Sequence, residues 1–221
     1  KDGEELFLMS ATKDGMVKKT PLAEYDTSRR DGIIAINLEE GDELIGVQLT
    51  DGKQDIILVT ADGQSIRFNE EEARPMARAT KGVRGIKLLE GDHVVAMEVA
   101  RDDAQLLVVT ENGYGKRTDM DEYRQQARGG KGVFTVRPSE RNGKIIGALV
   151  VKEDEEIMAI SKDGIIIRIK VEDISKMGRT TQGVTIMKVA EEDLVISITR
   201  VVEHDETEKT AKKEMTLFEE E

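Results

Sequence analysis

The segment Glu122–Val133, EYRQQARGGKGV, combines cations and glycines at a spacing suited to binding phosphate. Arg124, Arg128 and Lys131 supply positive charge, and no acidic residue follows Glu122 within the segment. Glycine lets backbone N–H groups approach an anion closely, while Arg and Lys neutralise its charge. The segment therefore predicts a loop that binds phosphate groups.

Acid-free basic segments recur along the chain. Arg74–Lys87 contains five basic residues, Arg124–Arg137 contains four and Lys176–Lys188 contains three, and none of them contains an acidic residue. A further segment, Arg29–Asp31, carries two arginines and one aspartate. Acidic residues gather elsewhere, in LEEGDE, LLEGD, KEDEE and AEED. The net charge of −12 is therefore unevenly distributed and does not exclude a polyanionic partner.

Two sets of glycines reveal an internal repeat. Glycines that follow Asp or Asn are spaced 48, 50 and 51 residues apart, and a second set is spaced 50, 50 and 51 residues apart. The first set is Gly15, Gly63, Gly113 and Gly164, and the second is Gly32, Gly82, Gly132 and Gly183. Because two independent markers keep one period, the chain consists of four repeats of about 50 residues.

The residues around these markers predict strands. Runs such as DIILVTADGQSIRF, at 55–68, place apolar and β-branched residues on both sides of Asp-Gly, which favours a type I′ hairpin turn. A second set of strands follows in each repeat, for example in ELIGVQLT and HVVAMEVA. AEYDTS and DMDEYRQQ predict one turn of helix before the basic loop. About four strands in about 50 residues is the size of a propeller blade, so the fold class is all-β and propeller-like.

The amino-acid composition indicates which residues form the core and excludes several kinds of site. Apolar residues make up 38% of the chain and aromatic residues 3%, so Ile, Val, Leu and Met must form the core. The absence of Cys excludes disulfides and thiolate metal sites, and His93 and His204 form no ligand cluster. No run of about 18 apolar residues could span a membrane. We expect a domain at 1–201 and a disordered tail at 202–221, which has eight acidic residues and three lysines.

A ring of equivalent blades places equivalent residues on one face. The basic loops would then line one rim, which forms an electrostatic track for a polyanion. Few aromatic residues are available to stack on single strands, so double-stranded DNA bound through its backbone fits best. The first residues enter the first blade without a lead-in, and four blades make a small ring. We therefore expect the four blades to be part of a larger ring.

The segment Gln126–Gly132, QARGGKG, resembles the Q-[RK]-R-G-G-[RK]-G motif of the C-terminal domain of DNA gyrase A. Six of the seven positions agree, and Ala127 departs from the motif. NGYGKRT, TKGVRGIKL, GDELIGV and GRTTQGV are similar to stretches of the same domain, so the resemblance covers about residues 5–201. It implies a β-pinwheel, a propeller whose neighbouring blades exchange strands. The family has about six blades with the motif in the first, so the loop here corresponds to a later blade.

The resemblance also implies a function. The family domain wraps double-stranded DNA on its basic rim and has no catalytic activity of its own. Gyrase, a bacterial ATP-dependent type II topoisomerase of composition A2B2, uses the wrap to introduce negative supercoils. ATP and Mg²⁺ act elsewhere in that enzyme, so we expect no cofactor in this chain. The expected partners are DNA, the rest of gyrase A, and gyrase B, in the cytoplasm at the nucleoid, with no membrane.

The resemblance and the repeat together assign the DNA-binding residues. These are Arg124, Gln126, Arg128, Gly129, Gly130, Lys131 and Gly132, with Arg78, Lys81, Arg84, Lys176, Arg179, Arg29 and Arg30 continuing the path. The acidic tail would compete with DNA for the rim.

Other interpretations differ in the features they require. The C-terminal domain of topoisomerase IV has a smaller ring and a degraded motif, and a protein-interaction propeller of the WD40 type would need no basic rim. GGKG does not match a nucleotide-binding P-loop, and GYG at 113–115 has no surrounding βαβ unit. The resemblance places the DNA-cleaving tyrosine in a preceding domain, so Tyr25, Tyr114 and Tyr123 are not expected to be catalytic.

Overall fold

The computed structural model describes residues 5–29 and 31–202, which form fifteen short strands and four single-turn 3-10 helices. Arg30, His204 and the predicted acidic tail beyond Val202 lie outside the described residues. The strands are β1 (Phe7–Thr12), β2 (Met16–Pro21), β3 (Leu44–Thr50), β4 (Asp55–Thr60), β5 (Gln64–Asn69), β6 (Val83–Arg84), β7 (Val94–Ala100), β8 (Gln105–Thr110), β9 (Tyr114–Asp119), β10 (Val133–Phe134), β11 (Ile145–Val151), β12 (Glu156–Ser161), β13 (Ile166–Lys170), β14 (Val184–Thr185) and β15 (Val195–Arg200). The helices are η1 (Leu22–Tyr25), η2 (Glu70–Glu72), η3 (Met120–Glu122) and η4 (Val171–Asp173).

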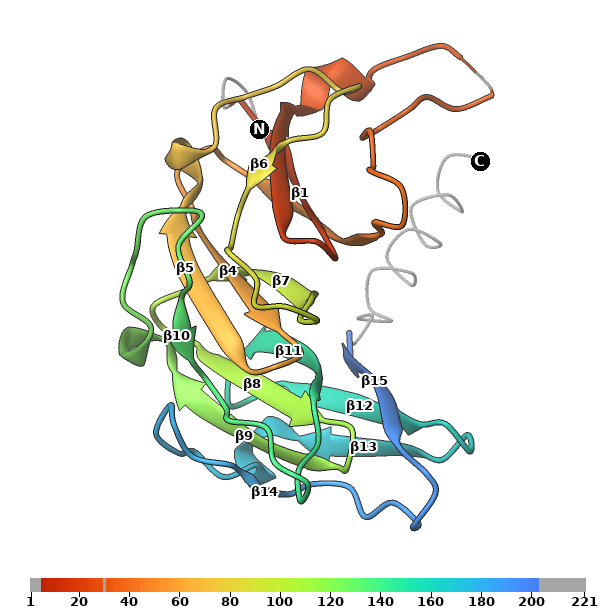
Figure 1. Cartoon of the computed structure of the whole chain (residues 1–221), viewed down its shortest axis with the longest axis vertical. Helices are drawn as coiled ribbons and strands as arrows, with labels where there is room; N and C mark the ends of the chain where they lie inside the picture. The colour runs from red at the N-terminus through yellow and green to blue at the C-terminus, as the bar shows by residue number, and fades with distance from the viewer. Residues whose placement is uncertain (1–4, 30, 203–221) are drawn as a thin grey trace, which may run out of the picture.

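The strands form four antiparallel sheets, one for each repeat. Their orders are β3-β1-β2-β6, β7-β4-β5-β10, β11-β8-β9-β14 and β15-β12-β13. The sheets follow one another as the blades of an open arc (Figure 1). The innermost strands β3, β7, β11 and β15 contact each other in that order. The all-β, four-repeat propeller expected from the sequence is confirmed.

Neighbouring blades exchange strands, as a pinwheel requires. The short strand β6 belongs to the second repeat but pairs with β2 of the first, where Val83 lies opposite Val17. In the same way β10 pairs with β5 and β14 pairs with β9. The exchanged strand satisfies backbone groups at an edge that would otherwise be unpaired.

Glycine is required where the exchanged strand crosses its partner. Gly132 has a φ of 74°, and a Cβ atom there would lie 2.3 Å from the carbonyl oxygen of Ser65. Gly82 and Gly183 meet the preceding blade in the same way, whereas Gly32 has nothing within 4 Å. Three of the four glycines of the second set, Gly82, Gly132 and Gly183, therefore mark strand exchange.

The hairpin turns differ from the type I′ turns expected from Asp-Gly. Lys13, Asp14 and Gly15 separate β1 from β2, and among the described residues only glycines have positive φ. A three-residue loop uses a type I turn followed by one left-handed glycine, here Gly15 at 80°. The connection therefore has three residues, one more than the expected type I′ turn.

Three apolar clusters fill the spaces between successive blades. Val17 and Ile56 share the cluster between blades one and two, and Ile57 and Leu106 share the next. Leu107 and Ile157 belong to the cluster between blades three and four. Ile, Val, Leu and Met dominate all three, as the composition predicted. No helix within 5–29 or 31–202 is long and apolar enough to cross a membrane.

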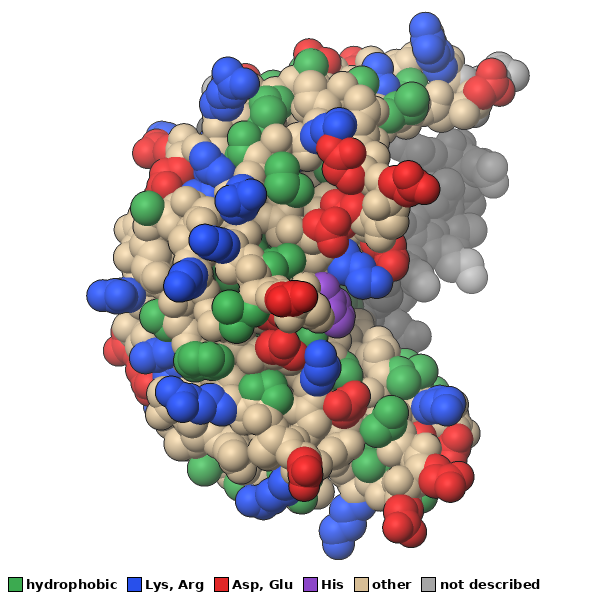
Figure 2. Space-filling view, in the orientation of Figure 1, with side chains coloured by type: hydrophobic (Ala, Val, Ile, Leu, Met, Phe, Trp, Pro, Cys, Tyr) green, Lys and Arg blue, Asp and Glu red, His purple; other side chains and the backbone are tan. Residues whose placement is uncertain are grey.

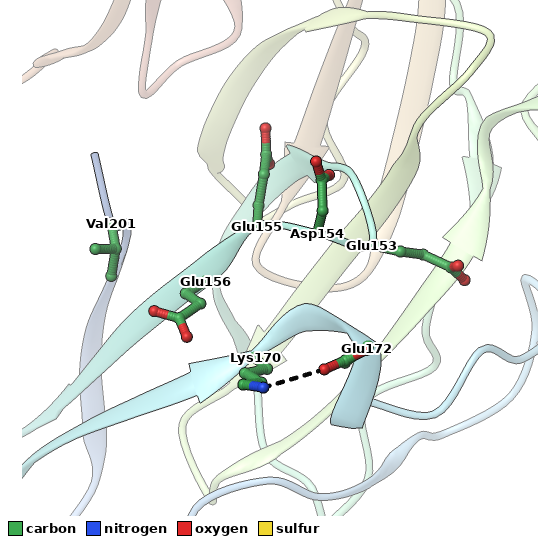
Figure 3. A pocket seen from close by; sticks show the side chains of 7 residues that line it. All are labelled: Glu153, Asp154, Glu155, Glu156, Lys170, Glu172 and Val201. Carbon is green, nitrogen blue, oxygen red and sulfur yellow. Dashed lines mark hydrogen bonds and ion pairs between the residues drawn. The ribbon is translucent and has the colours of Figure 1, made fainter. Parts of the chain in front are cut away.

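Acidic turns of the repeats have structural partners. Glu153, Asp154, Glu155, Glu156 and Glu172 surround a hollow at one end of blade four, but their side chains point in different directions (Figure 3). The ion pairs there are Arg117–Glu153 (2.6 Å), Arg200–Glu155 (3.2 Å), Arg101–Glu155 (3.9 Å), Lys170–Glu172 (3.3 Å) and Arg168–Glu156. Within the part of the chain that the structure describes, no group of acidic or histidine side chains could hold a metal ion.

Candidate nucleic-acid interface

The three acid-free segments occupy the same place in successive blades. Each runs from a 3-10 helix to the exchanged strand: from η2 to β6, from η3 to β10, and from η4 to β14. Lys and Arg side chains follow the convex edge of the arc in the orientation of Figure 1 (Figure 2). We call the segments at 74–87, 124–137 and 176–188 the rim loops.

Backbone hydrogen bonds hold the start of each rim loop against the preceding blade. The loops donate from Met76 N–H to the Lys19 carbonyl (2.8 Å), from Gln126 N–H to the Arg67 carbonyl (2.7 Å) and from Met177 N–H to the Arg117 carbonyl (2.9 Å). The three acceptors hold equivalent positions in β2, β5 and β9. The rim loops therefore begin in one register on successive blades.

One arginine in each rim loop binds the backbone of the repeat before it. The guanidinium of Arg78 donates to the Ile34 carbonyl at 2.6 Å, and the guanidinium of Arg128 donates to the Arg84 carbonyl. Arg179 makes the equivalent bond to Phe134. These three predicted DNA contacts are half-buried. Arg128 and Arg179 link one rim loop to the one before it, and Arg78 links the first rim loop to the segment at 31–38. A guanidinium has five N–H donors, so each side chain has further donors besides the one in this bond.

The glycines of the central rim loop also serve the link between loops. Gly129 N–H donates to the Gly85 carbonyl at 2.7 Å, and the Gly130 carbonyl accepts from Lys87 N–H at 2.8 Å. The Gly129 N–H is therefore occupied. Gln126 is half-buried, and its side-chain Nε2 has no hydrogen-bond partner among the described residues.

Exposed cations without ionic partners stand on the first two rim loops. Arg84, Arg124 and Lys131 are exposed and form no ion pair with a described residue. Lys81 pairs with Glu39, and Lys176 pairs with Asp119 at 3.1 Å. Exposed ion pairs contribute at most about 1 kcal/mol, so a phosphate can replace either acid.

The first repeat departs from the pattern. Arg29 is exposed, and its neighbour Arg30 lies outside the described residues. Residues 31–38 contain no strand, although Ile33 and Ile34 match β6 in position. The structure thus places Arg29 in a segment without the anchoring that the three rim loops share.

Two groups of basic residues were not among the DNA-binding residues assigned from the sequence. Lys87, Arg137 and Lys188 are exposed at one repeat position, and their spacings of 50 and 51 residues were a signal for them. Lys18 and Lys116 are instead buried in β2 and β9. Their signal was a lysine in a strand where other repeats have isoleucine.

The three tyrosines make contacts within the fold. Tyr123 is 1% exposed within the core, and its hydroxyl shares a hydrogen bond with the Thr135 hydroxyl. Burial raises the pKa of Tyr123 to about 12, so its hydroxyl stays protonated at neutral pH. Arg141 stacks over the Tyr114 ring at 4.7 Å. Tyr25 and Tyr123 hold equivalent positions, and both are at least half-buried.

Comparison with known proteins agrees with this geometry. The family model described as DNA gyrase C-terminal domain, beta-propeller, matches residues 7–51, 54–101, 104–152 and 155–201. Each match covers one repeat. Among solved structures, the C-terminal domain of DNA topoisomerase IV has a TM-score of 0.88 at 31% identity, over 96% of this chain and 67% of that one. The DNA gyrase A C-terminal domain has a TM-score of 0.82 at 26% identity, over 90% and 67%.

Sequence relatives point to gyrase. DNA gyrase A of Halalkalibacterium halodurans is 57% identical over 207 residues, covering 93% of this chain and 25% of the relative. DNA gyrase A of Mycolicibacterium smegmatis is 46% identical over 202 residues, covering 90% and 24%. The chain thus spans about a quarter of the length of these relatives. The match of all four blades shows that the chain belongs to the family of DNA gyrase C-terminal domains.

Proposed function

We propose that the chain binds double-stranded DNA on its rim loops and wraps it around the convex edge of the arc. The observation that carries this proposal is the row of exposed cations at equivalent positions of successive blades, represented by Arg84, Arg124 and Lys131. A duplex that follows the rim would meet each loop in turn. Binding through the phosphate backbone needs no sequence-specific contact.

In the whole enzyme, this wrap would support ATP-dependent negative supercoiling. The chain itself contributes DNA binding and no catalysis, while ATP and Mg²⁺ act in other parts of gyrase. Its partners are the rest of gyrase A, and gyrase B, in an A2B2 complex at the nucleoid. The relatives of 46% and 57% identity favour gyrase over topoisomerase IV.

A topological assay tests the proposal. The chain is bound to a relaxed DNA circle, topoisomerase I is added, and the linking number is read on a gel. We expect a positive shift, and affinity should fall by about 10³ between 50 and 200 mM salt if about six phosphates are contacted. Binding without a topological shift would exclude wrapping, and no binding at low salt would exclude the DNA interface.

We also propose that the arc is part of a larger ring. The fourth sheet has three strands, and Ile165 and Ile166 at its outer edge are 48% and 60% exposed. Ile34, at the position of an exchanged strand, is 61% exposed. Further blades would cover both edges. In a chain extended by neighbouring repeats, the amides of β13 should exchange more slowly with solvent; unchanged exchange would contradict the larger ring.

A further inference from the structure

Two buried lysines point at the backbone of the rim region. The side chains of Lys18 and Lys116 are fully buried in β2 and β9. Lys116 Nζ donates to the carbonyls of Gly178 (2.7 Å) and Arg179 (2.5 Å). Lys18 Nζ donates to the carbonyl of Ala35 (2.6 Å) and to that of Arg78. Burial of an ammonium is unfavourable unless it is hydrogen-bonded, and here the partners include the next repeat's rim loop.

The fold itself does not require a lysine at this position. Ile66 and Ile167 occupy the equivalent sites in the second and fourth repeats. Ile66 is fully buried and packs in the core between blades one and two. An apolar side chain therefore suits the strand, and the lysines must be explained by what their ammonium groups hold.

Two charged side chains of the third repeat, Glu122 and Lys116, bind the backbone N–H and the backbone carbonyl of Arg179 in the third rim loop. The Arg179 N–H donates to the Glu122 carboxylate at 2.8 Å, and the Arg179 carbonyl accepts from Lys116. The Arg179 side chain then reaches back to the Phe134 carbonyl. Lys116 and Glu122 thus determine where the backbone of Arg179 lies.

We propose that Lys116 and Lys18 are positioning residues that hold the following rim loops in the conformation that meets DNA phosphate. This inference rests on the proposed function for its DNA step. Without the ammonium, the loop carbonyls would turn towards water, and the loop cations would lose their common register along the rim.

If the Lys116 ammonium positions the loop, DNA binding should depend on the protonation state of Lys116. Burial lowers the pKa of Lys116 to about 8, the nearby Glu122 opposes this shift and Arg179 adds to it. Between pH 7 and 9 the ammonium becomes an amine, whose hydrogen bonds are weaker than charge-assisted ones. DNA binding should therefore weaken as the pH rises through about 8.

The free energy of unfolding should change with pH in the opposite direction to DNA binding. The pKa of Lys116 is lowered from 10.5, so the unfolded chain holds this proton more tightly. The contribution of Lys116 to the free energy of unfolding is thus unfavourable below pH 8 and rises between about pH 8 and 10.5. Removing the ammonium should spare folding at pH 7 while it weakens DNA binding.

Amide hydrogen exchange without DNA tests whether the lysine holds its loop. In Lys116→Met we expect the amides of Arg179 and Thr181 to exchange about tenfold faster, with an unchanged thermal midpoint. Lys116→Ile, which copies Ile66, is the second variant. Lys152→Met removes an exposed charge paired with Asp103 and should leave the loop unchanged. Unchanged exchange in both Lys116 variants, or loss of folding in both, would overturn the proposal.

Duplex binding at pH 7 and pH 9 tests the DNA step. The wild-type chain should lose affinity between these values, whereas Lys116→Met should bind about tenfold more weakly at pH 7 and respond less to pH. Lys152→Met should follow the wild type. Wild-type affinity in Lys116→Met would overturn the positioning role. If the wild-type chain bound no duplex at low salt, the proposed function would fail, and the exchange experiment would still decide whether the lysine holds the loop.

Discussion

Replacing Arg84, Arg124 and Lys131 together by alanine is expected to lower the affinity for duplex DNA about 100-fold at about 100 mM salt. These side chains are exposed and make no ion pair with a described residue, so the phosphates would be their ionic partners. Losing three phosphate contacts should reduce the slope of log affinity against log salt by about 3. The measurement is a titration of labelled duplex at several salt concentrations.

A matched variant controls for total charge. Lys13, Lys144 and Lys152 lie outside the rim loops and pair with Glu43, Asp62 and Asp103. Replacing these three lysines by alanine removes the same charge, yet it should leave the salt slope unchanged. The topological shift should disappear only in the rim variant. An equal loss of affinity in both variants would show that overall charge, and not the rim, governs binding.

Gly132→Ala is expected to lower the free energy of unfolding by about 2–5 kcal/mol. Gly132 has a φ of 74°, which is unfavourable for alanine, and the new Cβ atom would lie 2.3 Å from the Ser65 carbonyl oxygen. The collision should force β10 away from β5, where Val133 lies opposite Ser65. Urea denaturation followed by circular dichroism measures the change.

Gly32→Ala isolates the contribution of the backbone angle. Gly32 holds the same repeat position with a φ of 78°, but a Cβ atom there would meet nothing within 4 Å. We expect a loss of about 1–2 kcal/mol, from the left-handed conformation alone. Similar losses at Gly32 and Gly132 would mean that strand exchange contributes little to the stability of the second blade.

Hydrogen bonds between neighbouring rim loops make a substitution in one loop affect the next. Arg128 belongs to one rim loop and binds Arg84 of the loop before it, and Lys87 N–H binds Gly130 in return. A loop that loses its anchor therefore removes a partner from its neighbour as well. This mutual support explains why the half-buried arginines are less suitable than Arg124 or Lys131 for testing phosphate contacts.

The repeat, the blade and the basic loop could all be predicted from the sequence. Gly82, Gly132 and Gly183 keep one period, and apolar runs around Asp-Gly or Asn-Gly form hairpins in every repeat because strand pattern and turn residues act locally. The acid-free segments at 74–87, 124–137 and 176–188 likewise needed no tertiary information. Their common position along one edge followed from repetition alone.

The contacts of individual residues, by contrast, depend on how the blades pack. The Arg128 guanidinium binds a carbonyl 44 residues away, and Lys116 binds one 62 residues away. Strand exchange between blades brings these groups together. Local sequence patterns do not predict contacts between residues so far apart in the chain. Thus Gly132 proved necessary for a close strand crossing, and Arg128 proved to be half-buried. Lys116, which the sequence distinguishes only as a lysine where two other repeats have isoleucine, proved to lie beneath a rim loop, because burial depends on how neighbouring blades pack.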